Sequence, residues 1–372
     1  MIRRPPRSTL DRSSAASDVY KRQALEELLA LPQPSSEWSR VRREQLREEL
    51  GGRYLTELMA VASATDASLG RRLRVLRYLS PHFNDLPRSF VDKLAADASP
   101  EMRGQAAWLI GLRGERAEVP NLVSNLLTDG DAFVRRRALE ALLRNPPSAA
   151  QLRPLVYALE DRDRTIRYLA MVVLSHHPTE TWFDDVRARL GFQSRMRALV
   201  AAHLRREPAT SVVVRLMLNE LMDQLSINRS VEDRLDLLRL LGLFRAAIEE
   251  DVKTRRRTVE YLLSGFPDRH REIRWEQARR RGEYRGTAAV DVLLAELCNE
   301  KDYVTQFHLA HALARLPSGW KEESRQLAVD WFLSTQRGWI AEFTGKGRQL
   351  PDFWATALAD FGTHNRDAIL EQ

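Results

Sequence analysis

The sequence has few of the residue types on which disulfides, many metal sites and membrane spans depend. Its 372 residues include one cysteine, Cys298, so no internal disulfide, thiolate zinc cluster or Cys-x-x-Cys-His haem attachment can form within the chain. The longest apolar runs, such as the one from Tyr168 to Leu174, are far shorter than the roughly 20 residues that cross a bilayer. We therefore expect no membrane-spanning segment.

Catalytic patterns are also missing. The eight histidines form no His-Glu-x-x-His motif. His308 and His311 are three residues apart on one helical face, which metal binding permits, but no nearby acid at helical spacing completes a site, so we interpret them as core or surface histidines. Ser318 and Lys321 have Ser-x-x-Lys spacing without other support for a nucleophile. The sequence predicts a protein that is not an enzyme and holds no metal or cofactor.

Lysine is scarce, because 52 of the 58 basic residues are arginines. The formal net charge of +7 is also unevenly distributed. Residues 1–23 contain six basic and two acidic residues, which leaves 52 basic and 49 acidic residues, or +3, for the remaining 349. This is a modest charge for a phosphate-binding protein. We therefore expect the partner to be a protein rather than a nucleic acid.

The first 23 residues differ from the rest of the chain. The strings IRRPPRSTL and SSAASDVYKRQ resemble translated sequencing adapters. We therefore expect residues 1–23 to be a non-native, disordered segment. The alternative is a genuine disordered basic arm.

A repeat of 32 residues occupies the middle of the first half. Three segments align without gaps: SPEMRGQAAWLIG from Ser99, DAFVRRRALEALL from Asp131 and DRTIRYLAMVVLS from Asp163. In each, an N-cap residue is followed by an apolar residue three positions later, an arginine at four and an alanine at seven, as a short capped helix requires. The repeat positions that we assign a structural role are Ser99, Arg103, Asp131, Arg135, Asp163 and Arg167.

The segments between these helices predict one more helix in each unit. VPNLVSNLLTDGD from Val119 and QLRPLVYALEDRD from Gln151 match at an offset of 33, and both end in an acidic turn before the next cap. Isolated helices of about a dozen residues are marginal in water, so the units must stack to bury their apolar faces. The predicted fold is an all-α superhelix of stacked helical hairpins.

The pattern Asp-x-x-Val-Arg-x-x-Ala-x-x-Ala-Leu over residues 131–142 resembles the second helix of a HEAT-type repeat. The resemblance covers residues 99–175 and extends more loosely to 68–80 and 191–204; after residue 205 the period blurs, and Asp302 fits the turn only with a one-residue slip. It implies an α-solenoid in which the repeated arginine lies between stacked units and meets turn acids or backbone carbonyls. We expect N-terminal helices over 24–65, the repeat array over 66–317 and a capping element over 318–372.

Two arginines of the opening helix do not follow the repeat. Arg136 and Arg137 have no counterparts in the neighbouring units, and Arg144 lies one to two turns further on. These three residues are our candidates for binding a partner. The alternative is a solvated, arginine-rich face without a partner.

The end of the chain is rich in tryptophan, with four of eight tryptophans between Trp320 and Trp354. Helical spacing predicts two apolar stripes, Leu327 with Trp331 and Phe332, and Phe353 with Ala357 and Phe361. Glycines from Gly338 to Gly347 and Pro351 predict a loop between them. We expect residues 318–372 to close the apolar end of the array; an aromatic ligand groove is the alternative.

This segment also resembles, weakly, the region after the HEAT units of bacterial envelope proteins that carry a c-type haem domain, often with a dehydrogenase-like propeller. The residues that carry the resemblance are Leu313 to Leu316, Gly319, Trp320, Trp331, Phe332, Gly345 and Leu350. It implies that the chain is a fragment of a larger bacterial protein of the periplasm or cell envelope, with the cytoplasm as the alternative.

The sequence thus predicts a non-catalytic HEAT-repeat scaffold that contacts another protein or a neighbouring domain. The alternative is a nucleic-acid-binding protein similar to the HEAT-like DNA glycosylases, which hold duplex DNA on their concave face.

Overall fold

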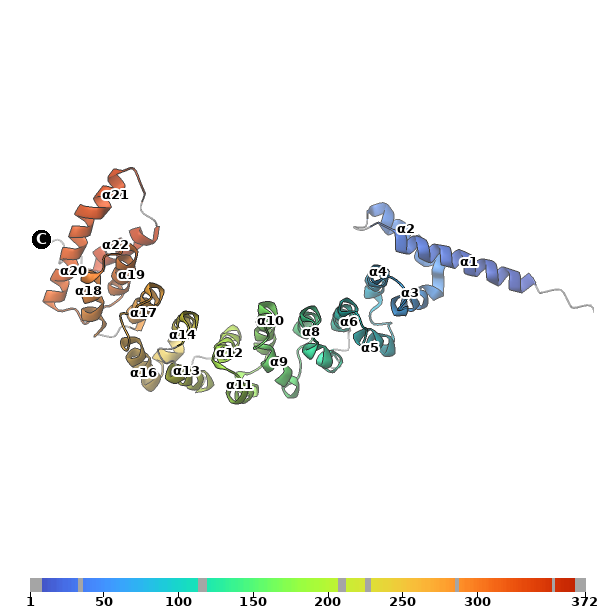
Figure 1. The fold of residues 1–372 in the computed structure, drawn as a ribbon, viewed down its shortest axis with the longest axis horizontal. Coiled ribbons are helices and arrows are strands. Elements are labelled where there is room, and N and C mark those ends of the chain that lie inside the picture. Colours follow the sequence, from blue (N-terminus) through green and yellow to red (C-terminus); the bar gives the residue numbers. More distant parts are fainter. Residues whose placement is uncertain are drawn as a thin grey trace, which may run out of the picture. The chain divides into compact units, whose positions relative to one another are not determined.

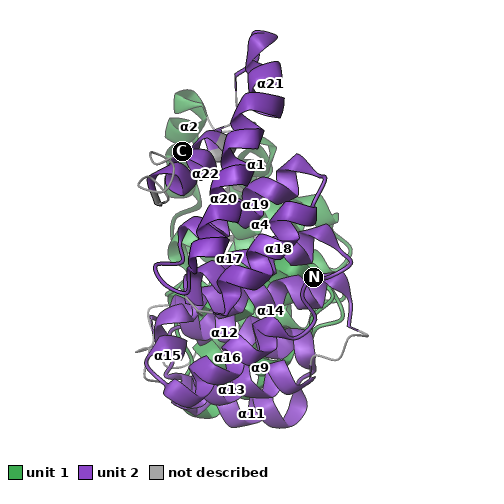
Figure 2. Ribbon diagram, turned by 90° about the vertical axis from the view of Figure 1, so that its left-hand side faces the viewer, with its two compact units in different colours: residues 1–173 green, residues 174–372 purple. Residues whose placement is uncertain are grey.

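The computed structural model describes residues 9–32, 36–112, 119–206, 212–224, 229–284, 288–349 and 352–364. Within these ranges every regular element is a helix, and none is long and apolar enough to cross a membrane. The chain divides into two compact units, Met1–Val173 and Leu174–Gln372, which Figure 2 colours separately. Each unit is built from helical hairpins that stack on one another, which confirms the predicted all-α solenoid fold (Figure 1).

Unit 1 begins with two longer helices and continues with shorter hairpins. In it, α4 packs on α6 and α6 on α8, while the helices between them form a second row. Its elements are α1 (Thr9–Ala30), α2 (Glu37–Leu50), η1 (Gly51–Arg53), α3 (Tyr54–Ser63), α4 (Leu69–Leu79), η2 (Ser80–His82), α5 (Arg88–Ala95), α6 (Pro100–Leu112), α7 (Val119–Val123), η3 (Ser124–Thr128), α8 (Ala132–Arg144), η4 (Ala149–Gln151), α9 (Arg153–Ala158) and α10 (Arg164–Leu174).

The second helix of each repeat begins one residue after its predicted cap. Ser99 Oγ accepts from Met102 N at 3.3 Å, and Asp131 Oδ1 accepts from Phe133 N at 2.7 Å. Asp163 Oδ1 likewise accepts from Thr165 N at 2.7 Å. These bonds satisfy backbone donors that the first helical turn leaves free. The repeated apolar and alanine positions are all buried: Met102, Ala106, Val134, Ala138, Ile166 and Ala170.

Two parts of unit 1 differ from the sequence-based prediction. The helices α7 and α9 are shorter than a dozen residues, and α7 passes into the 3-10 turn η3, where the hydroxyls of Ser124 and Thr128 donate to backbone carbonyls and compete with α-helical bonding. Helix α1 begins at Thr9, inside the segment expected to be disordered; residues 1–8 lie outside the described ranges.

Unit 2 continues with less regular hairpins. The helices α12, α14, α17, α19 and α22 pack in succession, with α13 and α16 beside one another in the other row. Its elements are η5 (Thr179–Thr181), α11 (Phe183–Arg189), α12 (Phe192–Leu204), α13 (Val212–Gln224), α14 (Val231–Leu243), α15 (Arg245–Glu249), α16 (Val252–Leu263), α17 (Arg271–Tyr284), α18 (Ala289–Asn299), α19 (Tyr303–Ala314), α20 (Glu322–Thr335), η6 (Gln336–Ile340), α21 (Ala341–Gly345) and α22 (Asp352–His364).

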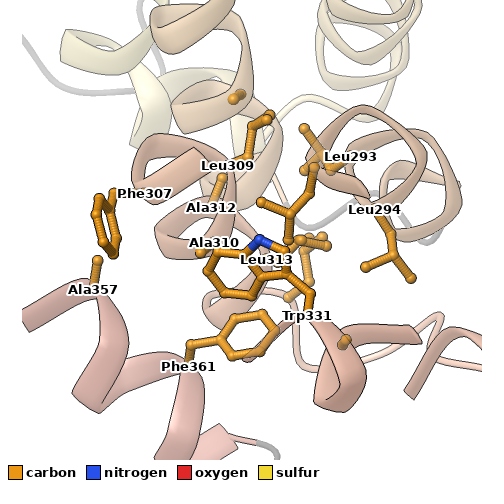
Figure 3. Packing of buried hydrophobic residues seen from close by; sticks show 14 of the residues in the cluster. Leu293, Leu294, Phe307, Leu309, Ala310, Ala312, Leu313, Trp331, Ala357 and Phe361 are labelled. Atoms are coloured by element: carbon orange, nitrogen blue, oxygen red, sulfur yellow. The ribbon is translucent and has the colours of Figure 1, made fainter. Parts of the chain in front are cut away.

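The tryptophan-rich segment packs on the last hairpin of unit 2. Trp331 and Phe361 meet edge to face with ring centroids 5.3 Å apart, and both lie against α19 next to Ala310 and Leu313 (Figure 3). This contact buries the apolar side of α19 beneath α20 and α22.

Two details of this segment correct the prediction. Leu327, expected in the buried stripe, is 52% exposed, because it lies on the outer side of α20. Gly338, expected in a loop, lies within η6, so the helix continues through a kink to Gly345. The side chain of Phe353, and Pro351, lie outside the described residues.

Candidate functional site

The repeated arginines of unit 1 bridge successive repeats. Arg103 in α6 donates from Nε and Nη2 to the carboxylate of Asp129 in the following turn, at 2.7 and 2.9 Å. Its Nη1 donates to the carbonyls of Asp97 and Ala98 in the preceding turn, at 2.9 and 3.0 Å. One guanidinium therefore ties two successive turns together, in a geometry that its rigid fork of donors suits.

The next repeat reproduces these contacts 32 residues later. Arg135 donates to the carboxylate of Asp161 at 2.7 and 3.1 Å and to the carbonyls of Asp129 and Gly130 at 2.7 and 3.1 Å. Arg167 donates to the carbonyls of Asp161 and Arg162, at 2.8 Å each. We call this series the arginine ladder.

The aspartates of the ladder have a second role. Asp129 Oδ1 accepts from the backbone N of Asp131 at 2.9 Å, and Asp161 Oδ1 accepts from that of Asp163 at 2.8 Å. The carboxylate that receives the arginine thus also orders the turn before the next helix. The hydrogen bond from Arg103 holds the pKa of Asp129 below its usual value, and Asp129 in turn raises the pKa of Arg103.

The ladder extends to positions that the sequence reasoning did not name. In unit 1, Arg72 of α4 pairs with Asp97 and is buried. In unit 2, Arg234 pairs with Asp268, and Arg274 lies 3.0 Å from Glu300. Each arginine stands four residues after the residue that precedes its helix, as Arg135 does after Asp131, so the available signal was an arginine at that position in segments that match the repeat only loosely.

Asp302 fits the repeat once its turn is seen. Its carboxylate accepts from Thr305 N at 3.1 Å and caps α19, while Glu300 Oε1 accepts from Asp302 N at 2.9 Å, as the ladder aspartates do. At the arginine position stands Gln306, whose Nε2 donates to the carbonyl of Glu300 at 2.6 Å. An amide here replaces the guanidinium.

The candidate partner-binding arginines are placed on α8. Arg136 and Arg137 both pair with Glu140, at 3.3 and 2.8 Å, and both lie over the ring of Phe133, 5.8 and 5.4 Å from its centroid. Arg144 is exposed in the last turn, where a positive charge complements the carbonyl end of the helix. These contacts hold two of the three side chains on the helix surface, where a partner can reach them.

A groove in unit 2 was not anticipated. It is a hollow of about 430 Å³ between α12 and α14, and its apolar walls come from Met196, Val200, Leu240 and Leu243. Polar side chains stand at its margin: Gln193, Arg197, Asp236 and Arg239. We call it the α12/α14 groove. The exposed fraction of Leu243 is 43%, so apolar surface is accessible there.

The paired histidines have other surroundings than a metal site. The ring of His308 stacks on Trp275 with centroids 4.5 Å apart, and His311 Nδ1 lies 3.6 Å from Asp360 Oδ2. Burial, and then the charge of Arg279, lower the pKa of His308 to about 4. Within the described ranges, no three His, Cys, Asp or Glu side chains gather as a metal ion would need.

Comparison with known families agrees with the repeat geometry. Residues 87–175 match the family of HEAT repeats, the segment that holds most of the ladder in unit 1. The chain is therefore a HEAT-repeat protein of the α-solenoid class. No curated protein matches the sequence.

Several solved structures are similar at low sequence identity. YibA of Escherichia coli matches over 77% of this chain and 98% of its own length, with 16% identity and a TM-score of 0.42. An engineered protein matches over 94% and 92%, with 17% identity and a TM-score of 0.39. The karyopherin Kap121p bound to Pho4p matches over 95% of this chain and 50% of its own, with 11% identity and a TM-score of 0.37.

Proposed function

We propose that this chain is a non-catalytic scaffold whose HEAT repeats bind another protein or a neighbouring domain. The observation that supports this most directly is the α12/α14 groove, where accessible apolar side chains lie between charged ones. Binding sites for protein segments commonly combine an apolar centre with a polar rim. The ladder arginines are occupied by structural contacts, so they leave this surface and the outer side of α8 for recognition.

The groove favours a partner segment with one large apolar side chain beside acidic residues. Arg197 lies on α12 and Arg239 on α14, so a guanidinium stands on each side of the apolar walls. The only carboxylate at the margin, Asp236, lies 3.1 Å from Arg239. A segment with acidic residues next to its anchor would exchange or extend this pairing, since electrostatic complementarity sets orientation and partner choice.

Selection of displayed peptides on the full chain tests this proposal. We expect the enriched peptides to share an apolar residue flanked by Asp or Glu. Leu243→Asp should weaken their binding about tenfold or more, because it places a carboxylate in the apolar wall. The matched control is Val252→Asp, a similar change at a side chain 82% exposed at the start of α16. Equal loss in both variants, or no enrichment, would contradict the proposal.

The arginines of α8 test the nucleic-acid alternative. If Arg136, Arg137 and Arg144 bound phosphates, affinity for duplex DNA would fall steeply with rising salt, and the slope would diminish in an Arg136→Gln, Arg137→Gln, Arg144→Gln variant. We expect no such salt-dependent binding by the wild-type chain, since Glu140 already balances part of this charge.

We also propose that the scaffold belongs to a larger bacterial protein with a c-type haem or dehydrogenase-like domain, as the resemblance around Trp320 and Trp331 implies. Sequencing the genomic DNA on both sides tests this. A Cys-x-x-Cys-His motif in the same reading frame would support it, and a neighbouring frame without any such domain would contradict it.

A further inference from the structure

Helix α17 carries two consecutive buried arginines with opposite surroundings. Arg280 is 9% exposed and is bound by two carboxylates of its own helix, Glu276 and Glu283. Arg281 is only 3% exposed, yet within the described part of the chain it forms no ion pair with any carboxylate. The positive charge of Arg280 is therefore compensated, whereas that of Arg281 is not.

The contacts of Arg281 are with groups that carry no net charge. Its Nε donates to the carbonyl of Leu262 at 3.0 Å, and Nη2 donates to the same oxygen. The ring of Phe266 lies over the guanidinium, with its centroid 3.9 Å from Cζ. The third nitrogen, Nη1, is buried and has no hydrogen-bond partner among the described residues. Burial lowers the pKa of Arg281 to about 10, so the group remains a cation at neutral pH.

A small cavity adjoins this guanidinium. Arg281 forms part of its wall together with Val259 and Leu263 of α16, Tyr284 of α17 and Ala289 of α18. Its volume is about 20 Å³, which is enough for one water-sized particle but not for a carboxylate-bearing side chain. The hydroxyl of Tyr284 already donates to the carbonyl of Leu241 at 2.6 Å, so its proton is not directed to an occupant of the cavity.

We propose that this cavity binds a single small monovalent anion, of the size of chloride, against Nη1 of Arg281. A buried cation without a counterion is costly, and an unbonded buried donor adds to the cost. A water molecule would satisfy the donor alone, whereas an anion satisfies the donor and neutralises the charge. The apolar walls suit a halide, which needs no directed hydrogen bonds from them.

Bromide is the probe that locates the anion. Crystals of the full chain grown in sodium bromide should show an anomalous peak within hydrogen-bond distance of Arg281 Nη1. Density of a water molecule without an anomalous signal would overturn the proposal, and so would an empty cavity.

Thermal unfolding in solution gives a second measurement. At equal ionic strength, we expect the Tm in chloride or bromide to exceed the Tm in gluconate by about 2 °C or more, since an anion that binds only the folded state stabilises it. The difference should vanish in Arg281→Met, which removes the cation. Arg256→Met is the matched control, because Arg256 is an exposed arginine of α16 whose side chain is 82% accessible.

A third variant covers the case in which Arg281→Met does not fold. Ala289→Leu fills the cavity from α18 while keeping the guanidinium, so it should abolish the halide effect and the bromide peak. If the halide effect persists in Ala289→Leu, or is equally absent from the wild-type chain, the cavity is not the anion site and the proposal is wrong.

Discussion

The two units solve the same stacking problem with different regularity. In unit 1, Arg103 and Arg135 each reach an aspartate 26 residues later, and the contacts repeat almost bond for bond. In unit 2, Arg234 reaches Asp268 after 34 residues, Arg274 uses Glu300, and a glutamine replaces the next arginine. The contact between an arginine and the next turn is therefore retained although the spacing is not, which shows that turn geometry rather than chain period is the conserved physical requirement.

The largest expected effect separates the ladders of the two units. Arg135→Ala removes four hydrogen bonds and leaves Asp161 without its guanidinium partner, so we expect a loss of about 3 kcal/mol in the free energy of unfolding. Arg234→Ala should cost less, about 1.5 kcal/mol, because Asp268 keeps hydrogen bonds from the backbone and ring of His270. Urea unfolding followed by circular dichroism measures both.

A double-mutant cycle provides the control for this comparison. Arg135→Ala and Asp161→Ala should be strongly non-additive, because each removes the same contact. The paired surface residues Arg256 and Glu260, which are far more exposed, should show a coupling near zero. Additive losses at Arg135 and Asp161 would mean that the ladder does not connect the repeats energetically.

An intermediate effect is expected where helices approach closely at glycine. A Cβ at Gly111 would lie 2.8 Å from the Cα of Ala141, so Gly111→Ala forces α6 away from α8 and should cost about 2 kcal/mol. A Cβ at Gly242 would overlap the guanidinium of Arg280, which can move. Gly242→Ala should therefore cost about 1 kcal/mol. A larger loss at Gly242 in thermal unfolding would show that Arg280 is held rigidly by its two glutamates.

The smallest expected effect concerns pH. The pKa of His308 falls from 6.5 to about 4 on folding, so unfolding takes up a proton in this window and stability decreases as the pH falls from 6.5 to 4. The pKa of Asp129 is lowered from 3.8, so its contribution is complete above pH 3.8 and is lost only below it.

Hydrogen exchange resolved by peptide measures the two units separately. Between pH 6.5 and 4, after correction for intrinsic exchange rates, we expect protection to decrease around α19 in unit 2 before it decreases around α8 in unit 1. His308→Gln should abolish the early decrease. Its persistence in that variant would assign the proton uptake to another group.

The regular half of the molecule could be predicted largely from sequence. Ser99, Asp131 and Asp163 begin helices because a cap acts through bonds within a few residues, and the buried alanines follow from helical periodicity. The ladder contacts of Arg103 and Arg135 are of the kind that the HEAT resemblance implied. In unit 2, loops of different length shift the period, so Arg234 and Arg274 could not be aligned without the turns that receive them.

Other features have no local signal at all. The exposure of Leu327 depends on how α20 rotates against α19, and the α12/α14 groove depends on side chains 40 residues apart. The difference between Arg280 and Arg281 is invisible in the sequence, where both are simply arginines beside glutamate.

By itself, the amino-acid sequence determined the helices, their caps and the stacking of hairpins, because these depend on local hydrogen bonds and on the spacing of apolar residues along one face. Only the tertiary structure decided which charges are compensated, which apolar side chains stay accessible and where a cavity remains. Those outcomes depend on atoms brought together from separate helices, and burial alone determines how strongly an unpaired charge or donor is penalised.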